Sequence, residues 1–177
     1  MRLEDLPKKY PLLFSHEEGS LEPFTLFGFE CGEGWFDIIE GACRCIMSKH
    51  FSEKQHLKYL ESSLNDTETY LKGVRSYYKD NTDEQILQKL KDDLELHSLS
   101  LKTIESCLPR FAQIKEKFGT LRMYYSGGDE RTDAITSFAE LMSATTCEVC
   151  GNRGSTRRTG WHKTVCDEHT KQVERQG

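Results

Sequence analysis

The most regular hydrophobic pattern lies in the middle of the chain. Between residues 52 and 108, apolar side chains recur every three or four positions, in two runs separated by the polar stretch 79–81. This heptad spacing is typical of helices that pack along a shared seam. The two runs therefore predict an antiparallel helical hairpin, whose arms begin at the capping-box sequences 52–55 and 82–85.

The region before these runs has a weaker pattern. Three prolines before residue 30 favour an irregular or extended segment. The apolar residues that follow them are candidates for a short strand or for the core: Phe24, Leu26, Phe27 and Phe29. A turn at 31–34, which contains two glycines, then leads into a helical stripe over about residues 35–49.

The region after Pro109 predicts a β-hairpin over residues 110–125 with its turn near Gly119. The candidate inward residues of this hairpin are Phe111, Ile114, Phe118, Leu121, Met123 and Tyr125. Asp129 is placed to cap a helix over 130–143. The apolar face of that helix would consist of Ile135, Phe138, Ala139 and Met142.

Four potential metal ligands lie in the C-terminal segment. Cys147 and Cys150 form one pair, and Cys166 and His169 form a second pair at the same spacing. Two such pairs suit a tetrahedral zinc ion, and four protein ligands make the predicted site structural rather than catalytic. His162 is an alternative fourth ligand with a less suitable spacing. The alternative to a metal site is a redox-active CxxC pair, although the βαβ context typical of that chemistry is missing.

These patterns together predict an α+β fold. A small core of β-hairpin and helix carries a C-terminal Cys3His zinc knuckle and an inserted antiparallel helical hairpin. The expected parts are the N-terminal part of the core at 1–50, the inserted hairpin at 51–108, the β-hairpin and helix of the core at 109–145, and the zinc-binding segment at 146–177.

Composition and charge restrict the partners. The formal net charge of −5 at pH 7 makes nucleic acid or an anionic membrane a less favoured partner. No apolar run approaches the roughly 20 residues that span a bilayer, and the start lacks the apolar core of a signal peptide. The seven cysteines, an odd number, favour metal ligands and free thiols over a disulfide framework. We therefore expect a soluble, cytoplasmic protein with no membrane partner.

Basic and aromatic side chains gather around the predicted β-hairpin and the zinc segment. The candidate ligand-binding residues are Lys115, Lys117, Arg122, Tyr124, Tyr125, Trp35, Arg157, Arg158 and Trp161. Cationic side chains of this kind hold phosphate groups, and aromatic rings stack on bases. The hairpin residues form a basic patch if Lys115, Lys117 and Arg122 share one face, whereas a bulge at Gly119 would separate them. Trp35 is either a stacking platform or a core anchor, and the core is the favoured of the two.

With these motifs in hand, the chain resembles a family of uncharacterised small zinc-binding proteins from phages and prophages. The matching segments are the Glu-Cys-Gly-Glu-Gly-Trp-Phe motif at 30–36, the stretch 114–125, the Gly-Gly-Asp-Glu motif at 127–130 and the zinc segment 147–169. The resemblance implies the cytoplasm of a bacterial host. It also implies either a counter-defence protein that captures a nucleotide immune signal or a regulator that contacts host protein or nucleic acid.

Three functions are therefore open. The first is a binder that sequesters a small phosphorylated nucleotide, of the cyclic nucleotide or cyclic ADP-ribose type, without chemistry. The second is a zinc-ribbon adaptor or regulator that binds nucleic acid or a host protein. The third is a nucleotide hydrolase, which the sequence favours least because no set of paired carboxylates and a base is evident. The helical hairpin also suggests a homodimer or a higher oligomer.

Overall fold

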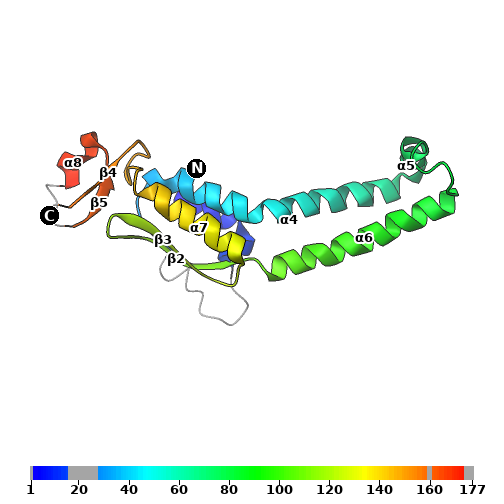
Figure 1. The fold of residues 1–177 in the computed structure, drawn as a ribbon, viewed down its shortest axis with the longest axis horizontal. Coiled ribbons are helices and arrows are strands. Elements are labelled where there is room, and N and C mark those ends of the chain that lie inside the picture. The colour runs from blue at the N-terminus through cyan, green and yellow to red at the C-terminus, as the bar shows by residue number, and fades with distance from the viewer. Residues whose placement is uncertain (1, 16–27, 159–160, 174–177) are drawn as a thin grey trace. The chain divides into compact units, whose positions relative to one another are not determined.

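The protein is described by a computed structural model, which covers residues 2–15, 28–158 and 161–173 (Figure 1). The fold is a mixture of helices and small sheets with a Cys3His cluster near the C-terminus, as the sequence predicts. The chain divides into two compact units. Unit 1 consists of Met1–Met47 and Cys107–Gly177, and unit 2 is Ser48–Ser106.

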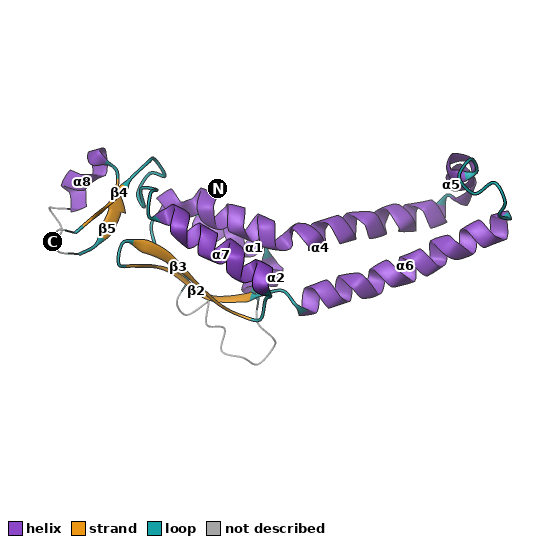
Figure 2. Ribbon diagram, in the orientation of Figure 1, coloured by secondary structure: helices purple, strands orange, loops and turns teal. Residues whose placement is uncertain are grey.

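Unit 1 contains a three-stranded sheet, which lies alongside helices of the same unit (Figure 2). Its strands are β1 (Phe29–Glu30), β2 (Arg110–Lys117) and β3 (Thr120–Ser126). They lie in the order β1-β2-β3, with β1 parallel to β2 and β2 antiparallel to β3. The inward residues of β2 and β3 are buried in the core: Phe111, Ile114, Leu121 and Met123.

The start of the chain differs from the predicted irregular segment, because it forms three short helices. These are η1 (Leu3–Asp5), α1 (Leu6–Lys9) and α2 (Pro11–Phe14). Pro7 and Pro11 lie in the first turn of their helices, where the missing N–H has no partner to lose. Of the apolar candidates at 24–29, Phe29 lies in β1, and residues 24–27 lie outside the described part of the chain.

Two helices complete unit 1. The first part of α4 (Phe36–Asn65) buries Ile39 and Cys43 in the core. The second helix, α7 (Glu130–Ser143), has the predicted bounds and the predicted cap, in which the Asp129 carboxylate accepts from the Thr132 N–H at 2.9 Å. Side chains of α7 also accept hydrogen bonds from the backbone of β3, since the N–H groups of Leu121 and Met123 donate to Ser143 and Glu140. The helix therefore covers an edge of the sheet that would otherwise be open to pairing.

Unit 2 contains the rest of α4, α5 (Thr67–Val74) and α6 (Asp83–Ser106). The predicted helix start at 52–55 is wrong, because α4 runs through it without interruption. Nothing in the preceding residues breaks a helix, so the Ser52 side chain has no orphan N–H groups to cap. Two histidine–glutamate pairs join α4 to α6, His50 to Glu105 at 2.9 Å and His97 to Glu53 at 2.7 Å.

The predicted capping box at 82–85 is confirmed at the start of α6, where Thr82 and Gln85 exchange hydrogen bonds. Buried side chains between α4 and α6 come from both helices: Leu57, Leu60, Ile86 and Leu90. Among the described helices, none combines the length and apolarity that a membrane span requires.

Candidate metal centre

The metal-binding segment is a tight knuckle followed by a short ribbon and a helix. The knuckle turns back through hydrogen bonds from Cys147 N to Asn152 O and from Gly151 N to Cys147 O, at 2.7 and 2.9 Å. Gly151 has φ 76°, a conformation that glycine adopts without the strain of a side chain. The ribbon and helix that follow are β4 (Ser155–Arg157), β5 (Lys163–Val165) and α8 (Asp167–Val173).

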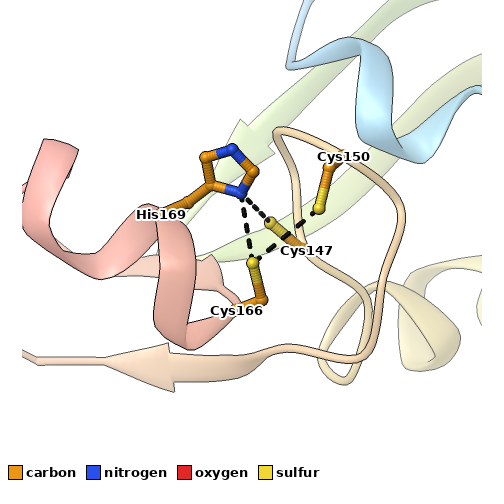
Figure 3. A group of neighbouring side chains, drawn as sticks. All are labelled: Cys147, Cys150, Cys166 and His169. Carbon is orange, nitrogen blue, oxygen red and sulfur yellow. Dashed lines mark hydrogen bonds between the residues drawn. The ribbon is translucent and has the colours of Figure 1, made fainter.

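The four predicted ligands converge at this point (Figure 3). Their ligand atoms all lie within 4.8 Å of one another. Sγ of Cys150 lies 3.8 Å from Sγ of Cys166, and Nδ1 of His169 lies 3.6 Å from Sγ of Cys147 and 3.1 Å from Sγ of Cys166. A tetrahedral zinc ion with bonds of about 2.3 Å to sulfur and 2.0 Å to nitrogen separates two sulfurs by about 3.8 Å and sulfur from nitrogen by about 3.5 Å. Two of the three separations match these values, so the cluster fits zinc.

The backbone of the knuckle prepares Cys147 to act as a ligand. Burial of its thiol opposes ionisation, but backbone N–H groups of Cys166, Cys150 and Val149 donate toward the sulfur and lower its pKa to about 6. A thiolate is the form of cysteine that binds a metal. Hydrogen bonds from the backbone of the metal-binding segment thus favour the thiolate form of Cys147, which is the form that binds a metal.

The helix α8 brings the second pair of ligands together. Cys166 immediately precedes α8, and its carbonyl accepts from the N–H groups of His169 and Thr170 at 3.1 Å each. The first helical turn therefore places His169 beside Cys166. The alternative ligand His162 instead lines a surface hollow with Trp161 and residues of the β2–β3 turn.

The glycine-rich motif at 31–35 docks on the knuckle. Gly34 N donates to Glu148 O at 2.8 Å, and the indole Nε1 of Trp35 donates to Thr146 O at 2.8 Å. A Cβ atom on Gly34 would lie only 2.3 Å from Cys147 O, and one on Gly32 only 2.3 Å from Glu148 O. The two glycines therefore permit the close approach of one backbone to another. Trp35 is fully buried. Of its two predicted roles, stacking platform and core anchor, the structure therefore supports the core anchor.

A buried carboxylate links this motif to the rest of the zinc segment. Glu148 is 6% exposed and accepts from Gly32 N at 3.1 Å and from Lys163 Nζ at 2.9 Å. Lys163 also lies 3.4 Å from the Glu116 carboxylate on β2, so it bridges two acids. The sequence gives no signal for Glu148, because its partners are distant in the chain.

Cys31, in the same motif, is not prepared for nucleophilic chemistry. Burial, together with the negative charges of Glu148 and Glu33, raises the pKa of its thiol to about 12. The thiol is therefore protonated near neutral pH, when a nucleophile would have to be a thiolate.

The outer face of the β2–β3 hairpin gathers the predicted basic residues. Lys115 pairs directly with Arg122 across the two strands, and Lys117 pairs with Thr120. The irregularity of this ladder lies near the start of β2 and not at the turn, so Lys115, Lys117 and Arg122 share one face. Tyr124 lies on that face too, with Lys115 Nζ 5.2 Å from the centre of its ring.

Other predicted ligand-binding residues are engaged elsewhere. The Tyr125 hydroxyl donates to Asp133 of α7 at 2.5 Å, and the half-buried Arg157 forms an ion pair with Asp167. Arg158 is exposed. The structure therefore assembles part of the expected set on one face of the hairpin and commits Tyr125, Arg157 and Trp35 to contacts within the fold.

An aromatic hollow adjoins the basic face at the hairpin turn. Its lining consists of Glu116, Lys117, Phe118, Trp161 and His162. Phe118, expected in the core, is 70% exposed, and Trp161 is 74% exposed. The Glu116 carboxylate holds both sides of the hollow, since it accepts from Gly119 N at 2.6 Å and from Trp161 Nε1 at 3.2 Å.

The exposure of Phe118 follows from its position in the turn. It and Gly119 are the two residues between β2 and β3, with φ 55° and 81°. Two-residue hairpin turns with positive φ at both positions normally carry asparagine, aspartate or glycine at the first. A Phe-Gly pair between two predicted strands therefore indicates, from the sequence, an exposed aromatic residue with a strained backbone conformation.

No protein-family model, curated protein or solved structure matches this chain.

Proposed function

We propose that the protein is a zinc-stabilised, non-enzymatic binder of a small phosphorylated nucleotide. The binding surface would be the outer face of the β2–β3 hairpin together with the aromatic hollow beside it. The observation that carries the proposal is the strand register, which makes Lys115 and Arg122 direct cross-strand neighbours on the face away from the core.

The basic face has the chemistry of a phosphate site. Cross-strand neighbours have Cβ atoms about 4.5–5.5 Å apart, so one phosphate group could bridge the two cationic side chains, each of which also has an acidic neighbour, Glu30 on β1 for Lys115 and Glu140 for Arg122. Among the described residues, the contacts of Arg122 with Thr120, Leu121 and Glu140 all use Nη1. The remaining guanidinium donors can reach a phosphate, and each charge-assisted hydrogen bond contributes roughly 1.5–3 kcal/mol.

The aromatic hollow suits the base of such a ligand. Phe118 and Trp161 offer ring surfaces, and stacking of a base on an aromatic side chain contributes about 1–3 kcal/mol. Lys117 belongs to both the hollow and the basic face, so one ligand could contact both. A strained φ at an exposed aromatic residue also favours a binding role, because strain of this kind tends to persist where function requires it.

Binding without chemistry agrees with the state of the neighbouring acid. Glu116 already accepts from Gly119, Trp161 and Lys163, which leaves it a positioning role rather than that of a base. A binder that does not consume its ligand acts by sequestration. Capture of a nucleotide immune signal in a phage-infected cell, with a cyclic nucleotide or cyclic ADP-ribose as the ligand, is the role that the resemblance implies.

Isothermal titration calorimetry with cyclic mononucleotides, cyclic dinucleotides and cyclic ADP-ribose tests the proposal. At least one of them should bind the wild-type chain, and Lys115→Gln or Arg122→Gln should each weaken its binding about tenfold. Lys58→Gln, on the exposed surface of unit 2, is the matched control and should leave the affinity unchanged. Chromatography of the mixture should recover the ligand intact. Absence of heat with all three classes at millimolar concentration, or equal affinity of the Arg122 variant, would contradict the proposal.

A zinc-ribbon adaptor that binds a host protein is the second candidate. The observation in its favour is the same pair of exposed rings, because aromatic residues dominate the energetics of protein interfaces. The two candidates differ in their dependence on charge. An adaptor should lose its partner on Phe118→Ala and keep it on Lys115→Gln. A nucleic-acid ligand would instead show binding that weakens steeply with salt.

A further inference from the structure

The exposed side of α7 carries a second apolar surface, which the ligand site does not use. A groove runs between the first part of α4 and α7, and its lining is apolar apart from Asp37, Arg44 and Arg131, of which Arg131 donates to Cys45 O at 2.6 Å. On the α7 side, Phe138 is 62% exposed and Met142 is 40% exposed, although the sequence places both on the core-facing stripe of that helix. Soluble proteins rarely expose a large contiguous apolar patch. An exposed apolar patch with polar residues around it marks an interaction surface.

The α4 side of the groove contains a glycine that no contact with another described residue requires. Gly41 lies in the interior of the helix, and a Cβ atom built on it meets nothing within 4 Å in the described structure. Glycine at such a position destabilises a helix by about 1 kcal/mol relative to alanine. No contact within the described chain requires this loss of a side chain, whereas close approach of another backbone would.

Opposite charges flank this glycine on the same helix. Asp37 and Arg44 both line the groove, four residues before Gly41 and three residues after it. Asp37 is exposed and forms no ion pair with any described residue. The Arg44 side chain is 71% exposed, and its one ion pair among the described residues is with Glu40, at 4.0 Å. Two such helices that cross antiparallel at Gly41 would bring Asp37 of each opposite Arg44 of the other, because the two residues lie about 6 and 4.5 Å from Gly41 along the axis.

We propose that the chain forms a two-fold symmetric dimer in which the α4–α7 grooves of two copies face each other, with Gly41 at the crossing point. The two helix pairs form a four-helix bundle, and Phe138 and Met142 lie in its interior. A second copy is the occupant that the charges select, since the pattern of one negative and one positive residue around a central glycine is complementary to itself. Self-complementarity of this kind is what a two-fold interface requires.

Sedimentation velocity of the full chain, over about 1–100 µM, tests the dimer. The wild type should sediment as a dimer within this range. Arg44→Asp and Asp37→Arg should each raise the dissociation constant at least tenfold, and the double variant D37R/R44D should restore it. Restoration is specific to a self-complementary interface, because each swapped charge meets the other swapped charge only in the partner.

Three further variants separate the groove from the rest of the surface. Phe138→Glu should abolish the dimer, whereas Leu96→Glu, which replaces an equally exposed apolar residue of unit 2 (both are 62% exposed), should not. Gly41→Leu should block association while the circular dichroism spectrum and thermal midpoint stay at or above those of the wild type. A chain that is monomeric at all concentrations, a dimer that only Leu96→Glu disrupts, or a double variant as weak as the single ones would each overturn the proposal. In the first case the groove would serve a different partner.

Discussion

Replacement of Gly34 by alanine tests how the glycine-rich motif holds the metal knuckle. The added methyl group would lie 2.3 Å from Cys147 O, 2.6 Å from Glu148 O and 2.6 Å from Gly151 N. All three atoms belong to the backbone, so no side-chain rotation relieves the overlap. Since ordinary contact begins at 3.4 Å, the motif and the knuckle must separate by about 1 Å.

The expected loss of stability has two parts. Overpacking of a fixed structure costs about 1–3 kcal/mol. The separation also breaks the hydrogen bond from Gly34 N to Glu148 O, now 2.8 Å long, at a cost of about 1 kcal/mol. The free energy of unfolding of unit 1 should therefore fall by about 2–4 kcal/mol. For a chain of this size, that change lowers the melting temperature by roughly 5–15 °C.

Fluorescence of Trp35 is a direct assay, because this buried residue follows Gly34 in the chain. The chain contains two tryptophans, so thermal melts in a Trp161→Phe background report on Trp35 alone. Gly73→Ala is the matched control, since its Cβ would meet nothing within 4 Å. It should leave the Trp35 transition unchanged. A Gly34→Ala protein that melts within about 2 °C of the wild type, a shift that corresponds to about 1 kcal/mol or less for a chain of this size, would refute the reasoning about close approach.

Three further predictions concern the metal, the turn and unit 2. His169→Ala should reduce the zinc content of the purified protein, measured by elemental analysis, whereas His162→Ala should leave one zinc per chain. Phe118→Gly should raise the free energy of unfolding by about 1 kcal/mol in denaturant titrations, because it relieves a positive φ, and should also weaken ligand binding in calorimetry. Ile86→Ala, which empties a fully buried position, should destabilise unit 2 by about 2–5 kcal/mol in urea titrations followed by circular dichroism, whereas Leu96→Ala should cost under 1 kcal/mol.

The parts of the structure that sequence patterns predict are those that short-range chemistry determines. The two ligand pairs each lie within four residues, so their spacing alone identifies the Cys3His cluster. The helix over 130–143 begins at its cap, which Asp129 forms with a residue three positions away. In both cases the contacts that determine the local structure join residues only three positions apart.

The errors arise where the same local pattern has two outcomes. The serine and glutamine at 52 and 55 have capping-box spacing, but a cap exists only where the preceding residues leave the helix, and in α4 they do not. Pro7 and Pro11 suggest a broken helix, yet in the first turn of a helix proline is tolerated. Phe118 has the alternation of an inward residue, but the turn conformation places it outside.

Contacts between distant segments were beyond the reach of sequence patterns. Gly32 and Glu148 are separated by 116 positions, and neither position has a local signal that names the other. From the sequence, the two glycines indicate a turn. That their backbone also closely approaches the metal knuckle depends on the complete fold.

These distant contacts also connect the metal to the proposed ligand face. A zinc ion bound by the cluster would fix β5 through Cys166, which follows it directly. From β5, Lys163 reaches both Glu148 in the knuckle and Glu116 on β2, and Glu116 in turn holds the hairpin turn and Trp161. A zinc ion held by the cluster would therefore have a role in the proposed binding without touching the ligand. Its four bonds would keep Lys163 in place, and Lys163 neutralises Glu116, the acid that positions both sides of the hollow.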